Sequence, residues 1–524
     1  MKKTITLSFL LLVTCLANAQ KFQRSELPTS LTIPWEITYG PDGYLWLTDS
    51  GGVVARVHPV TGVKTVVHTA PDYYPGSPKE QLQLCFRPNI GSGTLGLALD
   101  PTFGVSPLSY IYYVYSYNSG DTANPATKFK IVRLTWQSAT GTVIASQNLV
   151  TDIPSGYDHL GGRLLIAPVN GTNYLFLSVG DNGISETNSP DCYVPQSTNP
   201  NNFAQDPNFK NGKIHRFNLD GSIPSDNPIS GNSFYTRGHR NPQGLMYNSS
   251  LGILYDIEHG DRSDDEINIL EKGMNYGWKN VRGYHTDNNF PGEADFIANY
   301  TPNPNIANDM LKPAFYSWCA TPTQSTDPEY LNWCTVAPSD GVYYNSTGIP
   351  EWTNSLLVVT LKNGSVTDNE VFVLKLNPDG SLKTSTGSDP NPARFFGADQ
   401  ALNGRLRDIA VSPDGKKIFL VNNNTSQIRN PIKITVYTYM ESTGIHAAFV
   451  PELSLHPNPA GHTLSVTCDH EIRCTEIYNV IGEKVACMNG PASNIDISFL
   501  QSGFYTARVI TGDGVAITGK FAKQ

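Results

Sequence analysis

One pattern recurs along most of this 524-residue chain and restricts the folds that it can adopt. An apolar run leads into a turn rich in Pro, Asp, Asn and Gly, and an aromatic-rich run follows. Copies lie at 39–49, 97–118, 164–181, 245–261, 342–361 and 409–424. Apolar runs joined by such turns are typical of β-hairpins, and a series of hairpins is typical of a β-propeller. We expect an all-β chain with a six-bladed β-propeller as its body; a β-sandwich with repeated turns is the alternative.

The N-terminus has the features of a secretory signal peptide. Lys2 and Lys3 precede an apolar run at 5–16, and Ala17-Asn18-Ala19 supplies a cleavage pattern, which predicts a signal peptide at 1–19. The apolar run is shorter than the roughly 20 residues that span a bilayer, and no other run approaches that length. We therefore expect export and no transmembrane anchor.

The composition changes near residue 441. We expect the propeller domain to cover 20–440, a polar linker to cover 441–451 and a small C-terminal β-sandwich to cover 452–524. The last segment, with its Asn458-Pro459 turn, its Gly503-Phe504-Tyr505 strand and its basic end, resembles the C-terminal sorting domain of the type IX secretion pathway. That resemblance implies secretion machinery as a partner and a secreted or cell-surface location reached through the periplasm. An accessory or carbohydrate-binding module is the alternative.

Charge and cysteine content exclude some functions. The formal charge is −9 and becomes −11 without Lys2 and Lys3, which argues against nucleic acid or an acidic membrane as the main partner. Seven cysteines remain after the signal peptide, in an oxidising compartment, and Cys319 and Cys334 are the favoured disulfide pair. The absence of a C-x-x-C pattern argues against a zinc or redox motif.

Residues 234–284 combine cationic, amide, acidic and aromatic side chains. The segment Asp261-Arg262-Ser263-Asp264-Asp265-Glu266 places four acidic groups in six positions. Neighbouring carboxylates repel one another unless they are solvated or share a cation, and oxygen-rich loops suit calcium. Three aromatic residues follow closely, which favours a packed, metal-bound loop over a solvated acidic one; they are Tyr276, Trp278 and Tyr284.

Four cations form a second candidate site. Arg405 and Arg407 are two positions apart, so on a strand they point the same way. Two guanidinium groups on one face repel each other unless an anion lies between them, and arginine binds carboxylates bidentately. With Arg240 and Lys362, this pair would hold a small polycarboxylate.

A candidate general base lies at Asp158-His159, because histidine titrates near neutral pH; a structural histidine is the alternative. The G-x-G-x-x-G sequence at 91–96 leads into a predicted strand. A dinucleotide site needs a helix at this position, so this sequence is not interpreted as one.

Several ordered segments resemble the soluble PQQ-dependent sugar (glucose/aldose) dehydrogenases, which carry pyrroloquinoline quinone (PQQ) and calcium in a β-propeller. They are PWEITYGPDGYLWLTD, DHLGGRL, KIHRFNLDGSIPSDNP, GHRNPQGL, SDDEINIL, NYGWKNV, WCTVAP, LKNG and GRLRDIAVSPDG, within residues 31–440. The resemblance implies a quinoprotein that oxidises the anomeric carbon of aldoses to lactones by hydride transfer to PQQ, with calcium as Lewis acid and an external electron acceptor. The alternatives are a non-redox propeller that binds glycans at the cell surface and a calcium-dependent propeller hydrolase or lactonase.

The resemblance also implies individual roles. His159 would be the catalytic base, oriented by Asp158, which would also approach the cofactor or the sugar. Arg240 and Asn241 would contact the quinone, and Arg240 would also count among the catalytic residues. The remaining cofactor residues would be Tyr330, Thr335, Lys362, Arg405 and Arg407, and Trp333 would offer its aromatic face to the sugar.

Two calcium ions are implied in the same way. Gly260 and Asp261 would offer main-chain carbonyls to the catalytic ion, and Glu266, Tyr276 and Tyr284 match positions near a second, structural ion. The chain departs from the family pattern at Gly91, His259 and Asp261, where the family often has glutamine, glutamine and proline. A carbonyl ligand survives a side-chain change, so the departures affect the sugar preference, which stays open, more than calcium binding.

Overall fold

The structure is a computed structural model, and it divides into two compact units, 1–440 and 441–524. The described residues are 21–76, 92–123, 125–156, 158–182, 202–288, 290–320, 333–362, 369–423, 432–440, 453–468, 471–490, 494–511 and 516–524. The predicted signal peptide and linker lie outside them. Among the described residues, no helix has the length and apolar character needed to cross a membrane.

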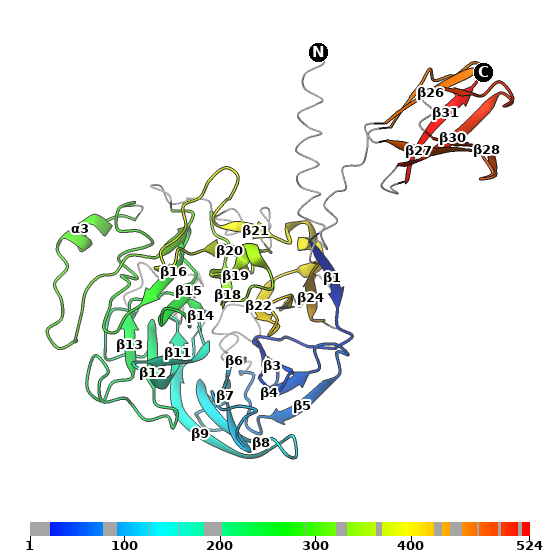
Figure 1. Cartoon of the computed structure of the whole chain (residues 1–524). Helices are drawn as coiled ribbons and strands as arrows, with labels where there is room; N and C mark the ends of the chain where they lie inside the picture. Colours follow the sequence, from blue (N-terminus) through cyan, green and yellow to red (C-terminus); the bar gives the residue numbers. More distant parts are fainter. Residues whose placement is uncertain are drawn as a thin grey trace. The chain divides into compact units, whose positions relative to one another are not determined.

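The described part of the first unit forms six four-stranded antiparallel sheets. In chain order, the first sheet contains β2 (Ile37–Tyr39), β3 (Leu45–Asp49), β4 (Val53–Val57) and β5 (Lys64–Thr69), and the second contains β6 (Thr94–Leu99), β7 (Leu108–Asn118), β8 (Thr127–Gln137) and β9 (Thr142–Pro154). The third sheet contains β10 (Leu164–Val169), β11 (Thr172–Val179), β12 (Lys213–Phe217) and β13 (Phe234–Arg237), and the fourth contains β14 (Pro242–Asn248), β15 (Ile253–Glu258), β16 (Asp265–Leu270) and β17 (Tyr316–Trp318). The fifth sheet contains β18 (Pro338–Tyr344), β19 (Ser355–Thr360), β20 (Val371–Lys375) and β21 (Ala393–Phe395). The sheets are arranged around a centre, with β6, β14, β18 and β22 near it and β5, β9, β13 and β21 at the periphery (Figure 1).

The sixth sheet joins the two ends of the unit. It contains β22 (Leu406–Val411), β23 (Lys417–Asn422), β24 (Thr435–Tyr439) and the N-terminal strand β1 (Phe22–Glu26). Phe22 lies opposite Tyr439 and Glu26 lies opposite Thr435 in an antiparallel register. Because the first strand completes the last sheet, the ring of sheets is closed by backbone hydrogen bonds.

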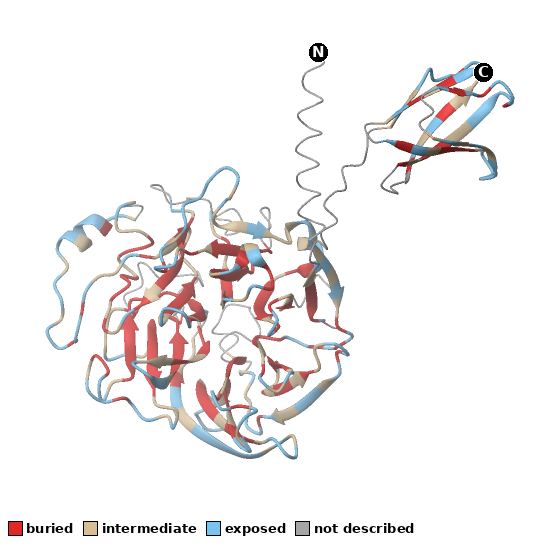
Figure 2. Cartoon of the chain, in the orientation of Figure 1, coloured by how far each residue is buried: buried red, intermediate tan, exposed pale blue. Residues whose placement is uncertain are grey.

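Apolar residues of neighbouring sheets pack together between them. Leu45 and Leu47 of β3 share a core cluster with Phe419 and Val421 of β23. The opposite face of the same strand carries Trp46, which packs in a second cluster with residues of β7 and β8. Strand β3 is therefore buried on both faces. Figure 2 shows that most of the inner strands are buried. Each fully buried large apolar side chain stabilises the fold by about 1.5–3 kcal/mol.

The described helical elements of the first unit are short. They are α3 (Glu293–Ala298), α4 (Gln400–Asn403), η2 (Pro350–Trp352) and η3 (Gly397–Asp399). Cys319 and Cys334 form a disulfide, which confirms the favoured pairing.

The described part of the second unit contains two sheets. One orders β25 (Leu453–His456), β26 (Thr463–Cys468) and β29 (Asn494–Asp496), and the other orders β28 (Lys484–Asn489), β27 (Ile472–Tyr478), β30 (Gly503–Thr511) and β31 (Ala516–Lys523). A single hydrophobic cluster draws on both, with Leu464 and Val466 from the first sheet and Ile477 and Val509 from the second. This unit therefore has a core of its own.

Candidate functional site

Four of the six sheets meet at one buried arginine. The Nη1 atom of Arg163 lies 2.5 Å from Glu36 Oε2, 3.0 Å from Asp408 Oδ2 and 3.1 Å from Asp340 Oδ2. Arg163 directly precedes β10 and Glu36 directly precedes β2, whereas Asp340 and Asp408 lie near the start of β18 and β22. The starts of these innermost strands therefore converge at one end of the ring, and most predicted site residues lie beside them.

Cationic and amide side chains form a connected chain next to this arginine. Arg407 Nη2 donates a 2.6 Å hydrogen bond to Gln243 Oε1, and Gln243 Nε2 donates a 2.7 Å bond to Asn241 Oδ1. Arg240 Nη1 donates to the His259 carbonyl oxygen at 3.2 Å. The predicted cofactor residues Arg240, Asn241 and Arg407 are thus brought together, although the first two precede β14 and the third lies on β22.

The cluster concentrates positive charge away from solvent. Burial, followed by the positive charges of Arg240 and Arg407, holds the pKa of His259 well below its ordinary value. Burial also lowers the pKa of Arg407, and the charge of Arg163 acts in the same direction. Arg240 Nε, Arg407 Nε and His259 Nε2 are buried without a hydrogen-bond partner among the described residues. Buried donors without partners are costly, so this geometry suits a bound anion.

The other predicted cofactor and substrate residues that the structure describes lie on further segments of the chain. Lys362 Nζ donates to the Trp333 carbonyl oxygen, which also accepts the Thr335 backbone N–H at 2.9 Å. The Arg262 guanidinium carbon lies 5.1 Å from the centre of the Trp333 ring. Arg405 precedes β22 and donates to Asn423 Oδ1 at 2.8 Å. Tyr330 and Gly91 lie outside the described residues.

The predicted base has a carboxylate partner that the sequence did not reveal. His159 Nδ1 lies 2.7 Å from Asp181 Oδ1, whereas Asp158 Oδ1 accepts the His159 backbone N–H at 2.9 Å. The imidazole is therefore oriented by Asp181, and Asp158 fixes the backbone. His159 has a φ of 51°, in the left-handed region. A Cβ added at Gly180 would lie 1.9 Å from the His159 carbonyl oxygen, so only glycine fits beside this turn.

Asp181 also connects the base to the cationic cluster, because its backbone N–H donates to the Arg240 carbonyl oxygen at 2.8 Å. Asp181 is fully buried. One feature of the sequence could have identified it. Asp181 ends the 164–181 copy of the repeat, and in that pattern an aspartate or asparagine often closes the aromatic-rich strand.

The acidic loop after β15 is tied to the cationic cluster. Asp261 Oδ2 pairs with Arg282 Nη2 at 2.8 Å, and its Oδ1 lies 3.7 Å from Arg240 Nη2. Asp265 Oδ1 accepts the Gly260 backbone N–H at 2.9 Å. The carboxylate of Asp261 is thus engaged by two arginines, so Gly260 and Asp261 can offer a cation their main-chain carbonyls.

Glu266, Tyr276 and Tyr284 are buried or half-buried and already hydrogen-bonded. Glu266 Oε1 accepts the Gly283 N–H at 2.6 Å, and burial raises the pKa of this carboxyl. The Tyr276 hydroxyl donates to the Ile269 carbonyl, and the Tyr284 hydroxyl accepts the Ser317 N–H at 3.1 Å. The two tyrosine hydroxyls therefore form hydrogen bonds that stabilise the fold.

Two carboxylates near Tyr284 were not found from the sequence. Both oxygens of Asp287 and Oε2 of Glu293 are buried without a partner among the described residues. Burial, with the charge of Asp264, raises the pKa of Asp287 to about 6, and burial raises that of Glu293. Buried carboxylate oxygens of this kind are ligands that a hard cation such as calcium prefers.

A buried imidazole serves as the cation in another acidic cluster. His239 Nδ1 lies 3.0 Å from Asp256 Oδ2 and 3.5 Å from Glu258 Oε2. Burial alone would lower the pKa of His239, but the charges of Asp256 and Glu258 outweigh it and raise the pKa to about 9. We therefore treat His239 as protonated and this cluster as a structural ion pair.

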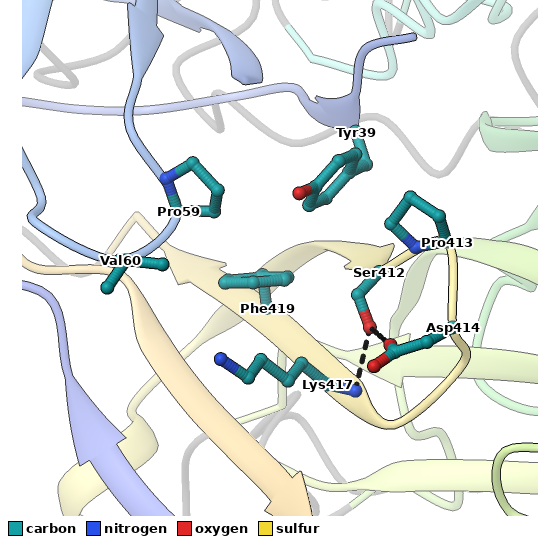
Figure 3. Close-up of a pocket in the computed structure, with 8 residues that line it drawn as sticks. All are labelled: Tyr39, Pro59, Val60, Ser412, Pro413, Asp414, Lys417 and Phe419. Atoms are coloured by element: carbon teal, nitrogen blue, oxygen red, sulfur yellow. Dashed lines mark hydrogen bonds between the residues drawn. The ribbon is translucent and has the colours of Figure 1, made fainter. Parts of the chain in front are cut away.

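A shallow pocket of about 260 Å³ lies elsewhere in the first unit (Figure 3). Its lining includes Tyr39, the last residue of β2, and Ser412, the residue after β22. The candidate site adjoins the beginnings of these two strands, so the pocket lies at their opposite ends. None of the predicted site residues lines it.

Comparison with known proteins shows the family. The family model for glucose/sorbosone dehydrogenases matches residues 31–430. The chain belongs to the glucose/sorbosone dehydrogenase family. It is 31% identical to quinoprotein glucose dehydrogenase B of Acinetobacter calcoaceticus, over 81% of this chain and 92% of that protein. It is 26% identical to aldose sugar dehydrogenase YliI of Escherichia coli, over 77% of this chain and 90% of that protein.

Solved structures share the fold of this family member. The PQQ-bound aldose sugar dehydrogenase of Streptomyces coelicolor has a TM-score of 0.53 at 22% identity, covering 80% of this chain and 98% of that one. The apo form of the Escherichia coli aldose sugar dehydrogenase has a TM-score of 0.55 at 24% identity, covering 80% and 100%. Residues 454–524 match the secretion system C-terminal sorting domain.

Proposed function

We propose that this protein is an exported PQQ- and calcium-dependent dehydrogenase that oxidises the anomeric carbon of aldose sugars to lactones. The observation that carries the proposal is the group of buried nitrogens of Arg240, Arg407 and His259 that have no partner among the described residues. They lie in the same network as the His159–Asp181 pair. The six sheets would be the blades of a β-propeller, and the two C-terminal sheets would form a sandwich.

The cationic cluster fits a polycarboxylate cofactor. PQQ carries three carboxylates, and Arg240, Lys362, Arg405 and Arg407 would pair with them, because arginine and lysine form strong charge-assisted bonds to carboxylates. Asn241 and Thr335 would complete the pocket. When bound, PQQ supplies the two-electron acceptor for the oxidation, and calcium polarises it.

His159 would take the proton of the anomeric hydroxyl. Its Nδ1 atom is engaged by Asp181, which leaves Nε2 to face the substrate. The Asp181 carboxylate stabilises the imidazolium that forms once the proton is taken. Trp333 would offer an apolar face to the sugar ring.

Calcium would be held in two places. The loop at Gly260 and Asp261 would give main-chain carbonyls to the ion at the cofactor. Asp287 and Glu293, beside Tyr284, offer the buried oxygens that a second ion needs, so we place the structural calcium there. Glu266 and Tyr276 would support this region through the hydrogen bonds that they already make.

The C-terminal sorting domain supports export to the cell surface or the medium, with secretion machinery as its partner. We infer that the domain acts only in delivery, because every residue assigned to the site lies in the first unit.

Cofactor titration tests this proposal. Apo-protein with calcium should bind PQQ with one site, and Arg407→Ala should weaken the binding by about 10-fold or more, since it removes a charge-assisted bond of about 1.5–3 kcal/mol. Arg133→Ala is the matched control, because Arg133 lies on β8 and bonds to Gln147. Equal PQQ affinity in the wild type and Arg407→Ala would overturn the assignment.

A further inference from the structure

The carboxylate that orients His159 is itself fixed by a tryptophan. The Trp278 indole Nε1 donates a 2.8 Å hydrogen bond to Asp181 Oδ2, and Asn202 Nδ2 donates to the same oxygen at 3.1 Å. The other oxygen, Oδ1, faces His159 at 2.7 Å. Both oxygens of Asp181 are therefore engaged, and the carboxylate plane has one orientation. Trp278 is 3% exposed, so water does not compete for this bond.

The ring of Trp278 also contacts the cationic side of the site. The guanidinium carbons of Arg240 and Arg282 lie 5.5 Å and 5.4 Å from its ring centre. Both arginines lie within ion-pair distance of Asp261 in the acidic loop. Trp278 thus contacts Asp181, the partner of the base, through its indole N–H, and the arginines on the cofactor side through its aromatic face.

The backbone around Trp278 is held by a separate network. Trp278 N–H donates to the Gly238 carbonyl at 3.0 Å, and Gln205 Nε2 donates to the Trp278 carbonyl at 2.6 Å. Lys213 is fully buried, and its ammonium group donates to the carbonyls of Phe203, Ala204 and Asn211 at 3.0, 2.9 and 2.6 Å. One buried lysine side chain therefore orders the segment that supplies both Asn202 and Gln205.

We propose that Trp278 is a positioning residue that sets the orientation and proton affinity of His159 through Asp181, with Asn202 as a weaker second donor. The inference rests on the proposed role of His159 as the base. A donor bonded to a carboxylate stabilises its negative charge. Without the indole N–H, Asp181 would attract the imidazole proton more strongly and would be free to rotate.

The charged groups around His159 are otherwise unchanged by this substitution. Asp158 precedes His159 in the chain, and Asp181 faces its ring. His259 is a further neighbour, because both His159 and Arg240 lower its pKa. The Arg240 carbonyl accepts the Asp181 N–H. All four remain in a Trp278→Phe variant. A change in the His159 titration can therefore be assigned to the lost donor.

The test measures the His159 imidazole directly in the apo-protein. Ring-labelled histidine is followed by NMR across pH, and the His159 signal among the 11 histidines is identified by its absence in His159→Gln. Trp278→Phe should raise the titration midpoint by about one pH unit. In the PQQ- and calcium-loaded protein, the acid limb of kcat/KM should move the same way, and kcat should fall about 10-fold or more.

Trp352→Phe is the matched control. Trp352 is fully buried, and its indole nitrogen has no hydrogen-bond partner among the described residues. It packs in the core shared by β18–β20 and β22–β24, so the same truncation there should leave the His159 midpoint unchanged. If Trp278→Phe fails to fold, Asn202→Ala provides the second variant and should shift the midpoint upward by a smaller amount.

An unchanged His159 midpoint in folded Trp278→Phe, or in Asn202→Ala where the tryptophan variant is unfolded, would overturn the inference. An equal shift in Trp352→Phe would also overturn it. Failure of the proposed function is distinguishable. It would appear as a wild type that does not oxidise aldoses with PQQ and calcium, while the NMR shift in the apo-protein would still support the positioning role.

Discussion

The Oδ2 atom of Asp265 lies 2.8 Å from the backbone nitrogen of Ala337, and the same oxygen accepts the Val336 N–H at 2.6 Å. Its other oxygen accepts the Gly260 N–H. One carboxylate thus fastens the acidic loop to the segment that follows Trp333 and Thr335. The loop assigned to calcium and the segment assigned to the sugar are therefore connected through hydrogen bonds of Asp265.

We expect Asp265→Asn to destabilise the first unit, because one amide cannot accept all three N–H groups and would leave a buried donor unpaired. The free energy of unfolding should fall by about 1–3 kcal/mol. Urea unfolding followed by tryptophan fluorescence measures it, since all 7 tryptophans lie in residues 35–352. Asp379→Asn, in an exposed turn, is the control, and equal losses in both variants would contradict the expectation.

Asp181→Asn should abolish most turnover and leave cofactor binding intact. The amide would hold His159 in the wrong tautomer or orientation and could not stabilise the imidazolium. Loss of a positioned base typically costs about 10²–10⁴-fold in rate. Steady-state kinetics with aldoses and a PQQ titration separate the two effects. Near wild-type kcat in this variant would remove Asp181 from the account.

The His239–Asp256 pair predicts a pH dependence of stability. A histidine in the unfolded chain titrates near 6.5, and the folded pKa of His239 is about 9. The folded state therefore holds this proton more tightly, so the stabilisation is present in full below pH 6.5 and is lost as pH rises through 9. We expect a loss of roughly 3 kcal/mol over this window from this group. Urea unfolding at several pH values should show it, and His239→Gln should flatten the profile; an unchanged slope would refute the assignment.

A chain ending near residue 445 should fold, bind PQQ and calcium, and oxidise aldoses like the full protein. The sixth sheet is complete at Tyr439, and the C-terminal unit has its own core. In the native host this chain should accumulate in the periplasm. Activity after reconstitution and cell fractionation are the two readouts. Loss of activity would make the tail part of the enzyme, whereas normal export would refute its sorting role.

The sheets were predictable because their signals are local. The repeat at 245–261 covers most of β14 and all of β15, and the one at 409–424 covers half of β22 and all of β23, so each copy of the pattern marks the hairpin that begins a sheet. Apolar runs and Asp-Gly or Asn-Gly turns act over a few residues, and sequence reasoning reads them well.

The contacts within the site depend on ring closure and could not be read in the same way. Arg163 meets Asp408 across 245 positions of the chain, and Trp278 meets Asp181 across 97. The sequence suggested Asp158 as the partner of the His159 ring because it is adjacent. Asp158 and His159 lie in the turn before β10, where the Asp158 carboxylate is used by the His159 backbone N–H, whereas Asp181 follows the neighbouring strand β11 and faces the imidazole.

The most direct test of the central claim is an anaerobic single-turnover experiment. Protein loaded with PQQ and calcium is mixed with an aldose without an electron acceptor, while quinone absorbance and lactone are followed. The account predicts that the quinone band bleaches with one lactone formed per PQQ, and that His159→Gln bleaches about 10²–10⁴-fold more slowly. A quinone band that sugars do not bleach, or a variant that reacts as fast as the wild type, would contradict it.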